Sequence, residues 1–260
     1  MGEKKKILNI QPEVGGFMTK PLQKILDQYV SSDFEVHCKG VKFGGYEGFY
    51  YCAVTATYIV DEIIQAEKDG YSAVISQCFL DPGVCEGRET VRIPVVGAGE
   101  ASIYVAMMCG DRLGIVTTGG TYRTQHHGAT LRLIRNKTKA LGVSERIVYC
   151  GTTGMTTFPE VGSPEAELVL GALERKSREA IEEKGAEVIV LGCTYLAGFG
   201  VELQRRIDVP VIDSSIAPLK FAELLITMNL THSQLTTPSP QLLGVTPVMK
   251  WPPTLRGYPR

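Results

Sequence analysis

The chain has 260 residues, of which 44% are hydrophobic and 21% are charged, a composition typical of a globular protein with one or two domains. The 27 basic and 28 acidic residues leave a net charge of −1, so no global positive field attracts nucleic acid or an anionic membrane. There is neither an apolar signal segment nor an apolar run long enough to span a bilayer, so we expect a cytoplasmic protein.

The cysteines do not form a framework. There are seven, an odd number, and no pair has the Cys-x-x-Cys spacing of a zinc knuckle. Disulfides and a metal site are therefore not expected, and each cysteine is either a buried small hydrophobe or a reactive thiol. The seven are Cys38, Cys52, Cys78, Cys85, Cys109, Cys150 and Cys193.

Short apolar runs alternate with helical patterns along most of the chain. Early in the chain we predict strands at 7–10, 34–38, 73–77 and 93–96, and helices near 18–30, 53–69 and 100–109. Later in the chain we predict strands at 113–117, 146–150, 187–191 and 209–212, and helices near 121–140, 164–184 and 216–227. The nearly continuous apolar strands are typical of sheets covered on both faces by helices. The alternation predicts an α/β fold with two pseudo-symmetric, doubly wound parallel-sheet domains.

The two series of elements repeat the same sequence features. Cys78 and Cys193 are 115 residues apart, and Pro94 and Pro210 are 116 apart. This indicates a duplicated unit, and we expect three regions. They are a first half over 1–110, a second half over 111–228, and a proline-rich extended tail over 229–260. The closing helix of the second half could pack on the first half.

Cys78 and Cys193 each follow a predicted strand, at the sheet edge where α/β proteins bind ligands. If the halves face each other across a cleft, two thiols approach one ligand from opposite sides. Such a pair suits inversion of a carbon that bears an acidic hydrogen. A thiolate removes the proton from one face while a thiol delivers a proton to the other. One thiol would need a lowered pKa, which a nearby helix N-terminus could provide.

The residues around both cysteines resemble those of the aspartate/glutamate/hydantoin racemase superfamily. The motif Gln-Cys-Phe-Leu-Asp-Pro-Gly at 77–83 is similar to the hydantoin and allantoin racemase branch. The second motif, Leu-Gly-Cys-Thr-Tyr-Leu at 191–196, lies between the Gly-Cys-Ala-Gly-Met of that branch and the Gly-Cys-Thr of amino-acid racemases. The resemblance implies cofactor-independent racemisation with Cys78 and Cys193 as the two bases, and a homo-oligomer. It also implies that Thr117, Thr118 and the backbone after each cysteine hold the substrate. Gln-Pro-Glu-Val at 11–14 departs from the usual Asn-Pro-Asn-Thr of this branch.

The loops expected to line the cleft contain no lysine or arginine, while Glu13 and Asp81 add negative charge. A dicarboxylic amino acid would lack a cationic partner there, so a neutral hydantoin ring with an apolar or aromatic 5-substituent fits better. The candidate substrate-binding residues are Gln11, Phe79, Leu80, Thr117, Thr118, Tyr122, Gly192, Thr194 and Tyr195.

Other functions remain open at this point. They are an allantoin or amino-acid racemase, a related decarboxylase with a single essential cysteine, a non-catalytic intracellular small-molecule sensor, and a redox switch with a Cys78–Cys193 disulfide.

Overall fold

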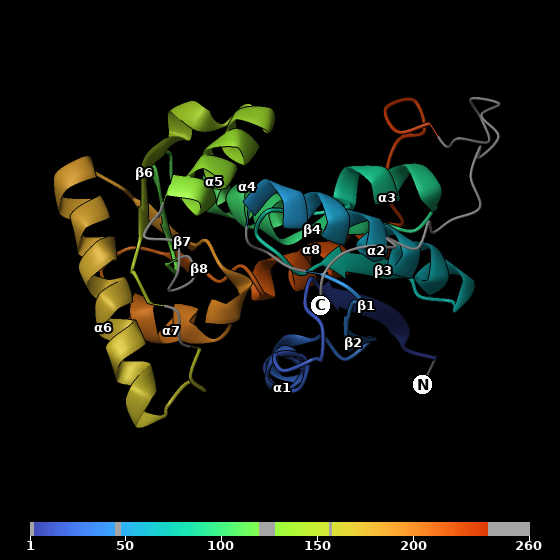
Figure 1. The fold of residues 1–260 in the computed structure, drawn as a ribbon, viewed down its shortest axis with the longest axis horizontal. Coiled ribbons are helices and arrows are strands. Elements are labelled where there is room, and N and C mark those ends of the chain that lie inside the picture. Colours follow the sequence, from blue (N-terminus) through green and yellow to red (C-terminus); the bar gives the residue numbers. More distant parts are fainter. Residues whose placement is uncertain (1–2, 45–47, 120–127, 156–157, 239–260) are drawn as a thin grey trace.

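The computed structural model describes residues 3–44, 48–119, 128–155 and 158–238. Within these ranges, eight strands form two four-stranded parallel sheets (Figure 1). The first sheet has the order β2-β1-β3-β4 and the second the order β6-β5-β7-β8. The strands are β1 (Lys5–Gln11), β2 (Phe34–Gly40), β3 (Ala73–Ser76), β4 (Val95–Gly97), β5 (Leu113–Thr117), β6 (Ile147–Thr152), β7 (Val188–Leu191) and β8 (Val211–Ile212). The identical strand order confirms the predicted fold class.

The described helices are α1 (Thr19–Tyr29), α2 (Gly48–Lys68), α3 (Val84–Thr90), α4 (Ala98–Cys109), α5 (Gly128–Ala140), α6 (Pro164–Arg178), α7 (Phe199–Gln204) and α8 (Ile216–Thr227). Helix α6 begins where Ser163 accepts a hydrogen bond from the Ala166 N–H, with Pro164 in the first turn. It continues into a π-helical turn, Glu179–Glu183. Residues 121–127, which the sequence assigns to the start of a helix, lie outside the described residues.

Helices α3 and α7 were not predicted from the sequence, and the two begin in the same way. Each follows a glycine in the left-handed region, Gly83 with φ 74° and Gly198 with φ 84°. Each glycine stands five residues after a cysteine, Cys78 or Cys193. A residue with a Cβ strains this conformation, so glycine is what allows both turns.

The two halves exchange their closing helices. Helix α4 follows the first sheet but packs on the second, where Ile103 and Ala106 join a core cluster with Ile115 and Val190. Helix α8 follows the second sheet but packs on the first, and its Leu219 lies in the cluster around the first sheet. These side chains are buried, and fully burying one such aliphatic side chain contributes about 1.5–3 kcal/mol to folding. Helices α4 and α8 also contact each other, so the exchange joins the two halves.

The beginning of the predicted tail is bonded to the first sheet. The Thr231 hydroxyl donates to the Arg92 carbonyl at 2.6 Å, and the Val95 N–H donates to Nε2 of His232 at 2.8 Å. Strand β4 is an edge strand, so His232 satisfies a backbone donor that would otherwise face water. The rest of the tail, 239–260 with Trp251, lies outside the described residues. None of the helices in the described ranges is both long and apolar enough to cross a membrane.

Candidate active site

Cys78 and Cys193 lie in matching turns at the carboxyl ends of β3 and β7. The Cys78 carbonyl accepts a hydrogen bond from the Asp81 N–H at 2.9 Å, and the Cys193 carbonyl accepts one from the Leu196 N–H at 3.0 Å. Each bond spans three residues, so both cysteines are presented by the same kind of turn. Neither cysteine forms a disulfide, and each residue as a whole is partly exposed. The duplication seen in the sequence therefore extends to the backbone hydrogen bond that follows each cysteine.

The two cysteine loops are in direct contact across the halves. The Thr194 hydroxyl, one residue after Cys193, donates to the carbonyl of Gln77, one residue before Cys78, at 3.1 Å. The Thr194 carbonyl in turn accepts from the Ser215 hydroxyl at 2.8 Å, at the start of α8. These two bonds link the Cys78 loop, the Cys193 loop and the start of α8.

The two thiols differ in the hydrogen bonds that their sulfurs accept. Loss of water around the sulfur raises the pKa of both above the ordinary thiol value. For Cys193 this is opposed by the Thr118 hydroxyl and the Tyr195 N–H, whose hydrogen bonds lower the pKa. For Cys78 the Leu80 N–H is the one hydrogen-bond donor to the sulfur among the described residues, and the pKa stays well above the ordinary thiol value because the sulfur is buried. The thiolate of Cys193 is therefore stabilised by a side-chain hydroxyl as well as by a backbone N–H.

Thr117, at the end of the neighbouring strand β5, is bonded to Gly192, the residue before Cys193. The Thr117 hydroxyl donates to the Gly192 carbonyl at 2.9 Å, and the Thr117 side chain is buried. A Cβ on Gly192 would lie 2.8 Å from the side chain of Ile115, so the strands approach closely only because this residue is glycine. The Thr117 hydroxyl is thus already engaged within the protein as a donor. Tyr122, another candidate binding residue, lies outside the described residues.

Three aromatic rings gather beside Cys193. Tyr195 has its ring centroid 5.6 Å from that of Phe17 and 4.9 Å from that of Phe158, both in edge-to-face geometry. Phe17 is 56% exposed, so the cluster opens to the solvent. Phe79, in contrast, is only 2% exposed and packs in the core beside α4, with Leu80 against the same cluster. This favours a packing role for Phe79 over the substrate contact that the sequence suggested.

Buried polar atoms at the carboxyl ends of β1 and β3 have no partner within the described chain. They are Oδ1 of Asn9, Oε1 of Gln11, Oε2 of Glu13 and Nε2 of Gln77. Asn9 and Gln77 bond each other through their remaining amide atoms at 2.9 Å. Oε1 of Glu13 accepts from the Met18 N–H at 3.0 Å, beside the first turn of α1, and burial raises the pKa of this carboxyl. Unpartnered buried groups of this kind are costly unless a ligand or water satisfies them.

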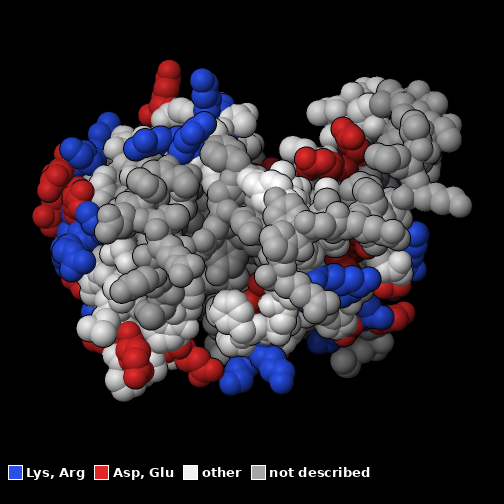
Figure 2. Space-filling model, in the orientation of Figure 1, with Lys and Arg blue, Asp and Glu red and all other residues white. Residues whose placement is uncertain are grey.

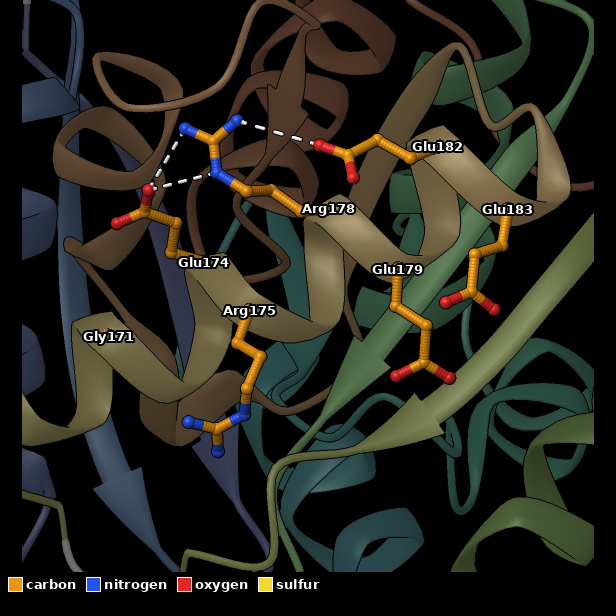
Figure 3. A pocket seen from close by; sticks show the side chains of 7 residues that line it. All are labelled: Gly171, Glu174, Arg175, Arg178, Glu179, Glu182 and Glu183. Atoms are coloured by element: carbon orange, nitrogen blue, oxygen red, sulfur yellow. Dashed lines mark hydrogen bonds and ion pairs between the residues drawn. The ribbon is translucent and has the colours of Figure 1, made fainter.

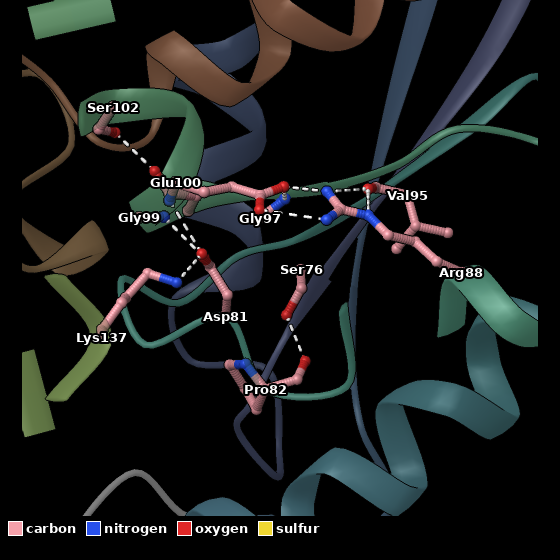
Figure 4. Close-up of polar contacts among 11 residues, drawn as sticks. Ser76, Asp81, Pro82, Arg88, Val95, Gly97, Gly99, Glu100, Ser102 and Lys137 are labelled. Atoms are coloured by element: carbon pink, nitrogen blue, oxygen red, sulfur yellow. Dashed lines mark hydrogen bonds and ion pairs between the residues drawn. The ribbon is translucent and has the colours of Figure 1, made fainter. Parts of the chain in front are cut away.

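The structure corrects the expected charge of the Cys78 loop. Asp81 does not present a free carboxylate, because Lys137 of α5 forms an ion pair with it (Figure 4). The pair is almost fully buried, with side-chain exposures of 12% for Lys137 and 4% for Asp81. The loops that the sequence predicts to line a cleft contain no lysine or arginine of their own. The cation comes instead from a helix of the other half.

Other hollows carry no similar chemistry. One lies along α6 and the π turn, where Arg178 reaches both Glu174 at 3.0 Å and Glu182 at 3.9 Å (Figure 3). On the same side of the molecule, basic and acidic side chains are interspersed (Figure 2). No group of three metal-ligating side chains occurs among the described residues. The cysteine turns are therefore the site with the clearest chemistry.

The fold and the site define a class of duplicated α/β proteins with one cysteine turn in each half. Residues 7–222 match the family described as Asp/Glu/Hydantoin racemase, and the chain belongs to this family. A hydantoin racemase from Pseudomonas sp. (strain NS671) is 30% identical over 234 residues, which cover 89% of this chain and 90% of that protein.

Two solved structures of allantoin racemases share the fold. The protein from Pseudomonas fluorescens has a TM-score of 0.80 at 26% identity and covers 94% of this chain and 98% of its own. The protein from Klebsiella pneumoniae has a TM-score of 0.79 at 26% identity and covers 89% of this chain and 91% of its own.

Proposed function

We propose that this protein is a cofactor-independent racemase that inverts C5 of a 5-substituted hydantoin, with Cys78 and Cys193 as its two acid/base groups. The observation that carries the proposal is the pair of matching cysteine turns joined by the Thr194–Gln77 hydrogen bond. Two similar thiols, one from each half, suit a reaction in which a proton is removed from one face of a carbon and added to the other face.

In the proposed reaction, one sulfur is a thiolate and the other a thiol. The thiolate takes the C5 proton, and the electron pair of the C–H bond moves into the ring carbonyl to give an enolate. The thiol on the opposite face then gives its proton to C5, which restores the carbonyl with inverted configuration. The sulfurs finish in exchanged protonation states, ready for the opposite enantiomer. The Thr118 hydroxyl and the Tyr195 N–H both donate hydrogen bonds to the sulfur of Cys193, and this favours Cys193 as the resting thiolate.

The surroundings support a hydantoin ring as the bound group. The ring is neutral and carries two N–H donors, which complement unpartnered acceptors such as Oε1 of Gln11. The edge-to-face cluster of Phe17, Tyr195 and Phe158 suits an aromatic 5-substituent. One feature favours allantoin as a second candidate. The ureido group of allantoin brings further N–H donors, and Oε2 of Glu13 is a buried oxygen that lacks one.

The test is a polarimetric assay with 5-benzylhydantoin, L-allantoin and L-aspartate, corrected for spontaneous racemisation. We expect fast loss of rotation for the benzyl compound. Racemisation of aspartate with both ring compounds inert would overturn the proposed substrate class.

The roles of the thiols are tested separately. Cys78→Ala and Cys193→Ala should each abolish racemisation, while each still exchanges the C5 proton of one enantiomer with deuterated solvent. The two variants should prefer opposite enantiomers. Racemisation by Cys78→Ala near the wild-type rate would refute the two-thiol mechanism and leave a one-base reaction or a binding protein.

A further inference from the structure

Each cysteine loop is tied to the start of the closing helix of its own half by a buried aspartate. In the first half, Asp81 accepts hydrogen bonds from the N–H groups of Gly99 at 2.7 Å and Glu100 at 2.9 Å, in the first turn of α4 (Figure 4). Its own N–H donates to the Cys78 carbonyl. The carboxylate that holds the helix and the backbone that holds the cysteine therefore belong to one residue.

In the second half the same link is made from the opposite end. Asp213, which follows β8, accepts from the Gly198 N–H of the Cys193 loop at 2.7 Å and from the Ser215 N–H, next to α8, at 2.9 Å. Asp213 is 8% exposed. The first half places its aspartate on the cysteine loop, whereas the second places it at the strand end. In both, one carboxylate bridges loop and helix.

The Asp81 carboxylate, which bridges the Cys78 loop and α4, is closely packed. Asp81 adopts φ 52°, an uncommon value for a residue other than glycine. A Cβ on Gly97 would collide with the Asp81 carboxyl, and one on Gly99 with the carbonyl of Phe79. The loop is also closed by the Ser76 hydroxyl, which donates to the Pro82 carbonyl at 2.8 Å (Figure 4). Such constraints leave the Cys78 turn little freedom while the bridge is intact.

We infer that Asp81 and Asp213 are positioning residues, each of which fixes the cysteine of its own half for proton transfer. This inference rests on the proposed racemase function. Neither aspartate needs to touch the substrate. Each acts through its loop, because a sulfur displaced by even 1 Å from the proton it transfers can slow a reaction by about a hundredfold.

The chemistry of the carboxylate explains why aspartate occupies both positions. Two N–H donors point at each carboxylate, and an ionised oxygen accepts such bonds more strongly than a neutral one. An asparagine offers one acceptor oxygen and turns an NH₂ group toward the second N–H donor. Asp81→Asn also loses the ion pair to Lys137, but it keeps the shape and tolerates the positive φ. The substitution therefore loosens the bridge without removing the side chain.

The experiment combines each asparagine substitution with each single-cysteine variant and measures exchange of the C5 proton in deuterated solvent. Cys193→Ala leaves only Cys78, and Cys78→Ala leaves only Cys193. We expect Asp81→Asn to slow exchange about tenfold or more in the Cys193→Ala background and to leave it nearly unchanged in the Cys78→Ala background. Asp213→Asn should show the reverse. Lys139→Met, an exposed cation on the same helix as Lys137, is the matched control and should change neither rate.

The outcomes separate the two ideas. If the single-cysteine variants exchange neither enantiomer, the proposed function fails before the aspartates are considered. If they exchange but each asparagine slows both backgrounds equally, the aspartates stabilise the fold in general and the inference is wrong. Unchanged rates overturn it as well. Should Asp81→Asn fail to fold, Lys137→Met takes its place, because it weakens the bridge and leaves the cap of α4 intact; the same background-specific loss is expected.

Discussion

The hydrogen bond from Thr118 to Cys193 gives a quantitative test of how the site controls its thiols. Thr118 is 7% exposed and follows β5 directly, so its hydroxyl is held in place by the sheet. Thr118→Val keeps the shape of the side chain and removes the donor. The pKa of Cys193 should then rise, because the thiolate loses one of the two groups that lower it.

The size of the effect follows from the energy of such a bond. A hydrogen bond to a charged acceptor contributes about 1.5–3 kcal/mol, which corresponds to roughly a ten- to hundredfold smaller thiolate population. The remaining thiolate is more nucleophilic, and this offsets about half of the change on a logarithmic scale. The observed rate of alkylation of Cys193 should therefore fall by about three- to tenfold.

The assay is alkylation by iodoacetamide at pH 8, followed by mass spectrometry of the two cysteine peptides. The peptides compared are those of Cys193 and Cys109. Cys109, an exposed cysteine at the end of α4, is the internal control, because the Thr118 hydroxyl bonds the sulfur of Cys193. The ratio of the two rates should fall in Thr118→Val. If the ratio is unchanged, the hydroxyl does not stabilise the thiolate, and the reasoning that makes Cys193 the resting base is refuted.

Three further predictions concern pH and stability. Because the pKa of both thiols is raised, kcat/KM should increase from pH 7 to 9, and a profile that is flat there would contradict this. Burial lowers the pKa of His232 to about 4, so the stability that neutral His232 contributes should be lost as the pH falls from about 6.5 towards 4. In thermal unfolding, His232→Gln should not show this loss. Identical plots of melting temperature against pH for both proteins would disprove the prediction. Thr194→Val should cost about 1 kcal/mol in the free energy of urea unfolding because the Gln77 carbonyl loses its donor, whereas the matched Thr227→Val on exposed α8 surface should cost less.

Much of the fold follows from the sequence because its signals are local and repeated. Buried parallel strands appear as short apolar runs, and the duplicated spacing of Cys78 and Cys193 aligns the two halves. Helices α3 and α7 were not predicted because they have only seven and six residues, too few to show a helical period in the sequence. The signal that could have revealed them is the glycine five residues after each cysteine.

The interactions that shape the site depend on contacts between distant segments. Nothing near Asp81 in the sequence indicates Lys137, because the two meet only when α4 crosses to the second sheet and lies beside α5. Phe79 looked like a binding residue for the same reason. Its neighbours in the sequence belong to a loop, while its neighbours in space belong to the core that the exchanged helix creates.

The two halves have the same topology but differ in the groups that donate hydrogen bonds to the cysteine sulfur. This difference has a consequence for the proposed reaction. Two enantiomers have equal free energies in water, so no asymmetry of the site can shift their equilibrium. Asymmetry can only decide which enantiomer meets a base that is already ionised. The Thr118 hydroxyl bonds the sulfur of Cys193, whereas within the described residues the sulfur of Cys78 is bonded by a backbone N–H and by no side chain. In the proposed reaction the enantiomer whose C5 proton faces Cys193 is therefore the one that the resting protein converts first.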